Sequence, residues 1–424
     1  MKRYRIGIDI GGTFTDIIIF DMHKGEIVKI LKLSSTPKNP EKAVIEGLRR
    51  LKGIINSDIE SIIHATTIAT NALLGQIGLE LPKTALITTK GFRDVLEIGR
   101  QQRPDLYNLF FEKPKPLIPR RYRFEVEERL NYKGEIIVPL NEKELLNTII
   151  EKLKKEKIIS VAISFLHSYA NPIHEIKAKE LIKKHLPSIF ISISSEVAPE
   201  HREYERTSTT VVNAVLMPIV TKYLKNILKE ITKLVSEVSI RIMQSSGGIC
   251  SIEEAMRLPV SIIESGPASG VVASVFLSKL IGVENLLSFD MGGTTAKAGT
   301  IIAGNPLVTT EYEVGGKIHA GRIIKGSGYP VRFPFLDLAE VSSGGGSIIW
   351  IDSGGALRVG PISAGADPGP ACYGKGGKEP TITDAHVVLG RLNPDYLLRG
   401  EMKIYKELAL KAFKEKISSM ISLD

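Results

Sequence analysis

Two copies of a short motif carry the residues best suited to phosphate chemistry. The motifs are Asp9-Ile10-Gly11-Gly12-Thr13-Phe14-Thr15 and Asp290-Met291-Gly292-Gly293-Thr294-Thr295-Ala296-Lys297, and each follows an apolar segment. Paired glycines let backbone N–H groups approach phosphate oxygens, and threonine hydroxyls can donate further hydrogen bonds. A carboxylate is tolerable beside a polyphosphate when a divalent cation lies between them. Asp9 and Asp290 are therefore predicted to bind Mg²⁺ or its waters.

Each motif predicts a strand, a tight turn and a second strand. The pattern lacks the GxGxxG spacing of a Rossmann fold and places an acid where a bare pyrophosphate would sit. A hairpin with an Asx cap remains the structural alternative for either copy alone, but two copies 281 residues apart, at positions 9 and 290, favour the two halves of a duplicated domain. The predicted phosphate-binding residues are Gly11, Gly12, Thr13 and Thr15 in the first copy and Gly292, Gly293, Thr294 and Thr295 in the second.

The elements around these motifs predict an α/β fold. Strands are expected at 4–10, 14–20, 26–33 and 61–65, with a helix at 40–51. Strands and helices alternate again as far as residue 194, as in an α/β sheet. This alternation is interrupted at 103–123, where Pro and Arg are frequent and a surface excursion is expected.

A long helix expected at 202–235 would bridge the two halves. The predicted domains are residues 1–195, a first ATPase half with the insertion at 103–123, and residues 196–424, a second and incomplete half.

Composition indicates a folded protein of two or three domains, with 424 residues, 43% of them hydrophobic and 24% charged. The net charge of +9 lies largely in helices that mix Lys with Glu, and 6% aromatic residues are few for base stacking, so no nucleic acid is expected as a partner. Cys250 and Cys372 are the two cysteines, too few for a disulfide framework, and Lys279 and Glu284 interrupt the apolar stretch 270–287. A cytoplasmic location without a membrane span or signal peptide is expected.

The two hairpin motifs resemble the phosphate motifs of the actin, sugar kinase and Hsp70 ATPase superfamily. The wider sequence is more closely similar to the hydantoinase A, 5-oxoprolinase and acetone carboxylase β-subunit family, with motifs in family order through essentially the whole chain. Gly247 and Gly248, in one of these motifs, are predicted to bind the nucleotide. The motifs lie at 65–74, 91–101, 103–107, 194–200, 202–206, 245–248, 264–268, 344–347, 363–374 and 383–385.

The resemblance implies duplicated actin-like, ribonuclease H-like ATPase domains with a nucleotide cleft between the halves, and ATP and Mg²⁺ as cofactors. It also implies phosphorylation of a carbonyl-derived oxygen, with Asp9 and Asp290 as catalytic residues. Phosphorylating an amide oxygen creates a better leaving group, because an amide is a poor electrophile. The predicted function is an ATP-dependent hydrolase of cyclic amides such as hydantoins or 5-oxoproline, working with a hydantoinase B-like subunit.

Three alternatives remain open: the ATP-binding subunit of an acetone- or acetophenone-type carboxylase, a truncated non-catalytic protein that binds nucleotide or a partner, and, less favoured, a lone sugar kinase. Family members usually continue past the equivalent of residue 424 into an adenosine-binding segment. A separate chain that completes the second half is therefore expected, or else a fragment or decayed copy. Residues 337–340 also stand where some family members have a His, a difference that bears on the substrate class.

Other polar residues allow both functional and structural interpretations. Cys372 is interpreted as a buried small residue, because no His lies nearby in sequence to form a thiolate. Arg93, Arg100 and Arg103 could hold a substrate carboxylate or carbonyl, or form surface ion pairs. The remaining interpretations are an interdomain network for Glu196, Glu200, Glu203 and Glu205 with Arg202 and Arg206, a structural role for His201, and turn capping for Asp352, Asp367 and Asp384.

Overall fold

The computed structural model describes most of the chain. The described residues are 3–12, 14–36, 39–55, 58–75, 79–235, 238–293, 295–319, 322–341, 343–400 and 402–421. Thr13 and Thr294, both predicted to bind phosphate, lie outside these ranges.

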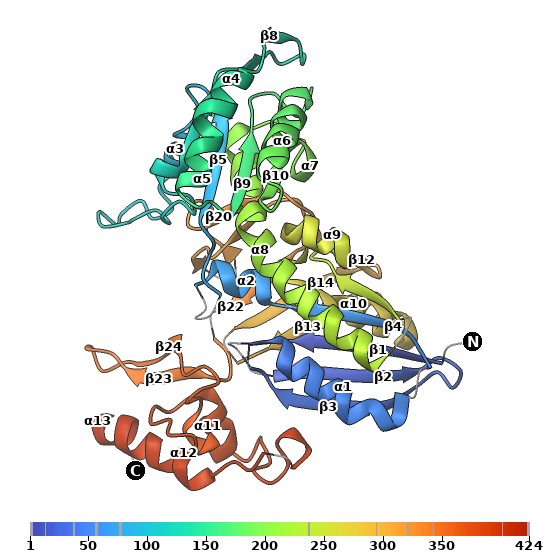
Figure 1. The fold of residues 1–424 in the computed structure, drawn as a ribbon. Coiled ribbons are helices and arrows are strands. Elements are labelled where there is room, and N and C mark those ends of the chain that lie inside the picture. The colour runs from blue at the N-terminus through green and yellow to red at the C-terminus, as the bar shows by residue number, and fades with distance from the viewer. Residues whose placement is uncertain are drawn as a thin grey trace.

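A six-stranded mixed sheet, called sheet A, carries the first motif (Figure 1). Its first three strands form an antiparallel meander, and two further strands run parallel to the first, so their carboxyl ends meet at one edge. In spatial order the strands are β12 (Ile249–Ser251), β11 (Ser239–Met243), β4 (Ile59–Thr66), β1 (Tyr4–Ile10), β2 (Phe14–Asp21) and β3 (Glu26–Ser34). The sequence-based strands and the α/β class are confirmed.

Helices cover both faces of sheet A. On one face, α1 (Glu41–Ile55) packs so closely on the sheet that a Cβ at Gly47 would lie 2.2 Å from Cδ1 of Ile17. Ile6 and Ile8 share this face, because they lie opposite Ile19 and Ile17 in the antiparallel register. α2 (Ile68–Leu73), α9 (Ile252–Arg257) and the 3₁₀ turn η3 (Pro259–Ile262) complete the surroundings of this sheet.

A second, all-parallel sheet, called sheet B, forms a separate lobe with its own core (Figure 1). Its strands in order are β10 (Phe190–Ile193), β9 (Ser160–Ser164), β5 (Thr84–Thr89) and β6 (Arg123–Val126). The elements around it are α3 (Val95–Ile98), η1 (Arg120–Tyr122), β7 (Arg129–Leu130), β8 (Ile136–Val138), α4 (Glu142–Glu144), the π-helical η2 (Leu145–Ile150), α5 (Glu151–Lys155), α6 (Ile173–His185) and α7 (Ser194–Val197).

One long helix, α8 (Glu203–Leu234), joins the two lobes as expected. Leu216 and Val220 belong to the core of sheet A, whereas Val211 and Ala214 belong to the core of sheet B. By length and composition alone α8 could also cross a membrane, but 61% of its apolar window is buried inside the protein. Packing between two cores therefore accounts for its apolar composition.

A third sheet, called sheet D, carries the second motif, and α10 (Ser265–Ile281) packs on it. Its strands are β13 (Leu286–Met291), β14 (Ala296–Ile302), β15 (Asn305–Pro306) and β22 (Leu338–Val341). Short strand pairs connect this sheet to the lobe of sheet B: β16 (Val308–Thr309) with β21 (Phe335–Leu336), β17 (Tyr312–Val314) with β20 (Tyr329–Val331), and β18 (Ile318–His319) with β19 (Arg322–Ile323).

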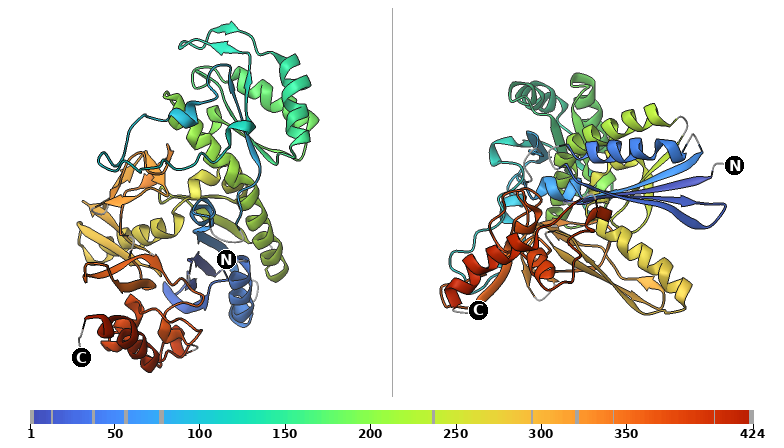
Figure 2. Two further views of the ribbon diagram at one scale, coloured as in Figure 1. Left: turned by 90° about the vertical axis from the view of Figure 1, so that its left-hand side faces the viewer. Right: turned by 90° about the horizontal axis from the view of Figure 1, so that it is seen from below.

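The C-terminal lobe lies at the end of the molecule opposite sheet B (Figures 1 and 2). It has a small core around Cys372, Val387, Ile404 and Ala409. Its elements are β23 (Ser347–Ile351), β24 (Leu357–Ser363), η4 (Ala371–Tyr373), α11 (Ile382–Val388), η5 (Leu398–Gly400), α12 (Lys406–Phe413), the π-helical η6 (Lys414–Ser418) and α13 (Ser419–Ile421).

Candidate functional site

The first motif forms the turn between β1 and β2. The N–H of Gly11 donates to the carbonyl of Phe14 at 2.9 Å, which closes the hairpin. The hydroxyl of Ser35, just after β3, donates to the Gly11 carbonyl at 2.7 Å and lies 3.1 Å from the Thr15 hydroxyl. Thr15 is buried, so its side chain supports the turn from within the fold.

The second motif repeats this turn. The N–H of Gly292 donates to the carbonyl of Thr295 at 3.0 Å, the same spacing as in the first copy. The triple-glycine segment then lies on the turn, because the N–H groups of Gly345 and Gly346 donate to the carbonyls of Gly292 and Gly293 at 3.0 and 2.7 Å. A Cβ at Gly346 would lie 2.9 Å from the Gly293 carbonyl oxygen, so this contact requires glycine. The internal repeat is therefore also a repeat of local structure.

Helix α10 contacts both motif-bearing sheets. A Cβ at Gly266, in its first turn, would lie 3.1 Å from Oδ1 of Asp9. Further along, Val271 packs against β14, where a Cβ at Gly299 would lie 2.5 Å from its Cγ2 atom. The same helix thus holds the face of β1 that carries Asp9 and the sheet that carries Asp290.

Asp9 has the electrostatics of a cation ligand. Its Oδ1 atom is buried and has no hydrogen-bond partner among the described residues. Burial, followed by the charges of Asp16 and Asp290, raises the pKa of Asp9 to about 7. An unpaired buried carboxylate oxygen beside a second carboxylate fits a divalent cation, which would relieve both the burial and the repulsion.

Within the described part of the chain, no group of three or more His, Cys, Asp or Glu side chains could hold a metal ion. Mg²⁺ commonly takes one or two protein carboxylates and fills its other positions with water and phosphate oxygens. Asp9 and Asp290 therefore suit a cation that arrives with a nucleotide better than a resident metal site.

The threonine motif at 65–74 lies between the first hairpin and α10. The N–H and hydroxyl of Thr67 both donate to the Ile10 carbonyl, at 3.3 and 3.2 Å. Ser265 donates to the carbonyl of Thr66 at 2.9 Å and accepts from its N–H at 3.1 Å. Sequence reasoning used these motifs only for the family resemblance and assigned them no role, but the structure shows that they position the Asp9 turn.

A buried lysine links the second motif to α10. Lys297 forms ion pairs with Glu264, at the N-terminus of α10, and with Glu340 of β22, the latter at 3.5 Å. Burial opposes the charge on Lys297, but the two carboxylates outweigh it and raise the pKa of the ammonium. Glu340 belongs to the 337–340 segment where some family members have a His, so the structure gives that position a partner.

Gly247 and Gly248 occupy the turn after β11, at the same edge of sheet A as the first motif. Gly247 has φ +88°, and a Cβ there would lie 3.0 Å from Val272 of α10 and 3.4 Å from Leu336. These contacts are with the packing around α10, and a nucleotide-binding role for the two glycines stays a prediction.

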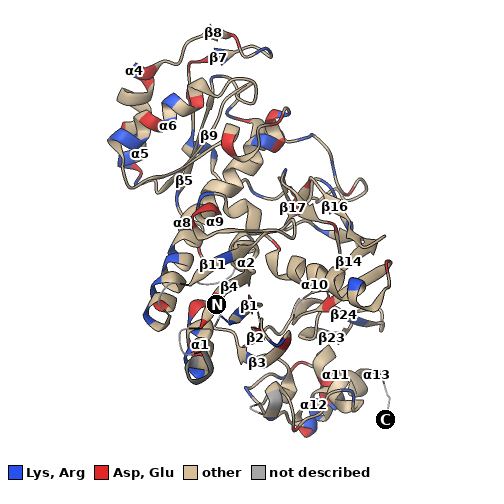
Figure 3. Cartoon of the chain, turned by 90° about the vertical axis from the view of Figure 1, so that its right-hand side faces the viewer, with Lys and Arg blue, Asp and Glu red and all other residues tan. Residues whose placement is uncertain are grey.

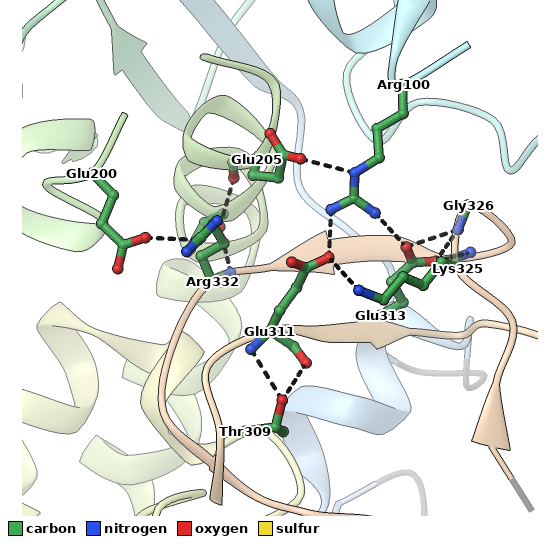
Figure 4. Close-up of polar contacts among 11 residues, drawn as sticks. Arg100, Glu200, Glu205, Thr309, Glu311, Glu313, Lys325, Gly326 and Arg332 are labelled. Carbon is green, nitrogen blue, oxygen red and sulfur yellow. Dashed lines mark hydrogen bonds and ion pairs between the residues drawn. The ribbon is translucent and has the colours of Figure 1, made fainter. Parts of the chain in front are cut away.

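Arg100 joins three elements in an ion-pair network (Figure 4). It donates to Glu205 of α8 at 2.8 Å, to Glu313 of β17 at 3.1 Å and to Glu311. Arg332 similarly pairs with Glu200 at 2.7 Å. The arrangement supports ion pairing over substrate binding for Arg100, with partners from 311–332 that the sequence did not indicate.

The same ion pairing changes the local structure. Of the helix expected at 92–100, only Val95–Ile98 forms, because Gly99 and Gln101 adopt positive φ values and turn the chain toward α8.

Cys372 and Asp384 have structural roles. Asp384 accepts from the N–H of Cys372 at 2.7 Å and forms a capping box with Thr381. Burial and then the charge of Asp384 raise the pKa of the Cys372 thiol, which disfavours the thiolate. Asp352 caps a turn through the N–H groups of Gly354 and Ala356, as expected.

Comparison with known proteins identifies the family. The model of the hydantoinase/oxoprolinase N-terminal region matches residues 5–186, and the hydantoinase/oxoprolinase model matches residues 206–424. The chain belongs to the hydantoinase/oxoprolinase family.

Within this family the chain is 58% identical over 412 residues to an uncharacterized protein of Methanocaldococcus jannaschii, covering 97% of this chain and 60% of that one. It is 35% identical to the caprolactamase subunit alpha of Pseudomonas jessenii, covering 100% of this chain and 59% of the relative. It is 33% identical to 5-oxoprolinase 1 of Arabidopsis thaliana, covering 93% and 32%. The chain thus spans about 60% or less of the length of these relatives.

Two solved structures share the fold. A nucleotide-free acetone carboxylase matches with a TM-score of 0.81 and 26% identity, over 100% of this chain and 60% of that chain. The ATP-dependent caprolactamase of Pseudomonas jessenii matches with a TM-score of 0.78 and 34% identity, over 99% and 60%. Membership in the actin-like ATPase fold class is confirmed by these matches, and ATP-dependent enzymes share the fold across the whole chain.

Proposed function

We propose that this hydantoinase/oxoprolinase family chain is the ATP-binding part of an enzyme that activates a cyclic amide by phosphorylation before ring opening. The observation that carries the proposal is the paired turn geometry, with the unpartnered Asp9 carboxylate oxygen beside Asp290. The similarity to a caprolactamase subunit and to a 5-oxoprolinase supports a cyclic amide as the substrate class.

In this proposal the chain's own residues provide the charge environment for phosphoryl transfer. Asp9 and Asp290 hold Mg²⁺ through its inner positions or its waters, and the glycine turns approach the phosphates. Bound Mg²⁺·ATP would supply the phosphoryl group that makes the amide oxygen a leaving group. Thr67 and Ser265 keep the Asp9 turn and α10 at a fixed spacing through their hydrogen bonds.

The partner in this proposal is a hydantoinase B-like subunit, and a separate chain completing the second ATPase half is the other partner that the repeat implies. Relatives named as alpha and gamma subunits are parts of multi-subunit enzymes, which supports partner chains in general. A cytoplasmic location belongs to the same proposal.

The test is ADP release by this chain with its partner chains and Mg²⁺, measured with three substrate sets. Hydantoin, 5-oxoproline or ε-caprolactam should each be tried without bicarbonate, and at least one should raise the rate. Stimulation only by a ketone together with bicarbonate would replace the hydrolase by a carboxylase. No stimulation by any set would favour a non-catalytic nucleotide-binding protein.

A carboxylase subunit is the second candidate, and one observation favours it. The acetone carboxylase structure has the higher TM-score of the two solved neighbours described above, although its sequence identity is lower. The steps that follow phosphorylation need different nucleophiles in the two enzymes, so the bicarbonate requirement separates them.

A further inference from the structure

β13 is the counterpart of β1 in the internal repeat, but the two strands differ in burial. On β1 the alternate apolar side chains are at most 4% exposed: Ile6, Ile8 and Ile10. The residues 281 positions later are also apolar, and they are 40 to 74% exposed: Leu287, Phe289 and Met291. The same face of the same structural unit is therefore covered in one copy and open in the other.

Sheet A shows what covers this face when it is buried. β1 pairs with β2 on one side and with the parallel strand β4 on the other, and α1 packs over the isoleucine face. Among the described strands, β13 pairs with β14 alone, which leaves its other edge free. An edge strand with free N–H and C=O groups is a template for another strand.

The open apolar surface continues onto the helix that flanks β13. α10 packs on β13 and β14 through its buried side, which includes Val271 and Ser278. Its other side exposes large apolar side chains over the last two turns: Phe276, Leu277, Leu280 and Ile281. An apolar surface on both sides of a free strand edge is typical of an interaction site.

We propose that the free edge of β13, with Leu287, Phe289 and Met291, is the docking surface for a polypeptide segment that adds a strand parallel to β13 and an apolar helix over these side chains. The repeat sets the pairing: the incoming strand should lie along β13 as β4 lies along β1, where Ile6, Ile8 and Ile10 are opposite Ile62, His64 and Thr66. The occupant is a segment equivalent to the part of the longer relatives that this chain does not match.

The length of the relatives supports this occupant over a second copy of the chain. This chain covers 60% of the Methanocaldococcus jannaschii relative at 58% identity, so about two fifths of that relative is available to supply the strand and helix. A second copy would bring another open β13 edge and no unpaired parallel strand. The proposal does not depend on the catalytic activity, because it concerns assembly alone.

The probe is the part of the Methanocaldococcus jannaschii relative outside the matched 412 residues, produced as a separate chain. It should form a one-to-one complex with the 424-residue protein, measured by light scattering after size-exclusion chromatography. Backbone amides of residues 286–291 should exchange with deuterium more slowly in the complex, since strand pairing protects them. Phe289→Asp should weaken the complex at least about tenfold, because an apolar contact is replaced by a buried charge.

The matched control is Ile362→Asp, on β24, where the native side chain is 67% exposed in another strand. This variant should bind the probe as the unchanged protein does, and both variants should retain the unchanged protein's circular dichroism. Absence of a complex at tens of micromolar, or equal binding by Phe289→Asp, would overturn the proposal. A dimer of the 424-residue chain that Phe289→Asp dissociates would assign the surface to a second copy and overturn it as well.

Discussion

Asp9 shows how a ligand-binding residue can oppose the stability of its own fold. Its buried Oδ1 atom has no partner among the described residues, and Asp16 and Asp290 repel its charge. Lys32, the nearest cation that favours its ionised form, is already bound to both carboxylate oxygens of Asp16 at 2.8 and 2.7 Å. The site is therefore poised for a cation that the side chains themselves do not supply.

Removing the Asp9 charge should abolish the proposed activity and spare the fold. In Asp9→Asn we expect loss of Mg²⁺-dependent ATP hydrolysis by the assembled enzyme, because a neutral amide is a weak Mg²⁺ ligand. Asp290→Asn should act in the same direction, and Asp395→Asn, on the exposed surface, should leave the rate unchanged. Full turnover in both the Asp9 and Asp290 variants would contradict the metal assignment.

The same carboxyl predicts a pH effect on stability. Its pKa rises from an ordinary value of 3.8 to about 7 on folding, so the folded state binds the proton more tightly than the unfolded state. Without Mg²⁺, the free energy of unfolding should therefore fall by about 2–4 kcal/mol from this group between about pH 4 and pH 7, and then level off. Urea unfolding in EDTA at pH 4.5 and 8 measures the change, which should be smaller in Asp9→Asn. An equal pH dependence in both proteins would show that Asp9 is not strained.

At the scale of elements, polar networks hold the lobes in place. Arg100, in the loop after α3, ties α8 to β17, and Glu313 also accepts from the N–H of Gly326 at 2.8 Å. Lys297 plays a similar part between β14, β22 and the start of α10. The outer helices instead carry Lys and Arg interspersed with Asp and Glu (Figure 3), as the mixed sequence indicates.

Arg100→Met should lower the free energy of unfolding by about 2–3 kcal/mol, because it leaves the buried carboxylates of Glu205 and Glu313 without their cation. The matched control is Arg120→Met, which breaks an equally well-aligned pair with Asp94 on the exposed surface. Exposed ion pairs contribute little, so the control should keep the urea midpoint of the unchanged protein. Equal midpoints for the two variants would contradict a structural role for the Arg100 network.

At the scale of the whole molecule, α8 makes two lobes into one cooperative unit. Its buried side chains belong to the cores of both sheet A and sheet B. The C-terminal lobe has a much smaller core, centred on Cys372, Val387, Ile404 and Ala409, at the far end of the molecule (Figure 2).

Native-state hydrogen exchange should therefore show two levels of protection. Amides of α11 and α12 should open at a lower free energy than those of residues 207–227 in α8, since fewer buried apolar contacts resist local unfolding. Mass spectrometry of peptides from both regions measures the difference. Equal protection in the two regions would mean that the C-terminal lobe unfolds only with the rest.

The sequence by itself determined the local features. Alternating apolar residues specified the strands around each motif, and Gly11 and Gly292 specified turns whose hydrogen bonds prove equivalent. These features follow from neighbouring residues, because strand period and turn chemistry are local. The fold class and the family could be predicted for the same reason: long motifs stay readable in one dimension. The domain boundary near residue 195 stays a prediction, and sheet A takes strands from both sides of it.

Only the tertiary structure decided what surrounds those motifs. Glu264, Lys297 and Glu340 meet from three elements, and Gly266 approaches Asp9 although 257 residues separate them. The open face of β13 is equally invisible in sequence, because Leu287 and Phe289 continue the same apolar pattern that is buried on β1. Burial, ion pairing and the raised pKa of Asp9 depend on which distant segments come together in space, and the pattern of a single segment carries no record of its neighbours.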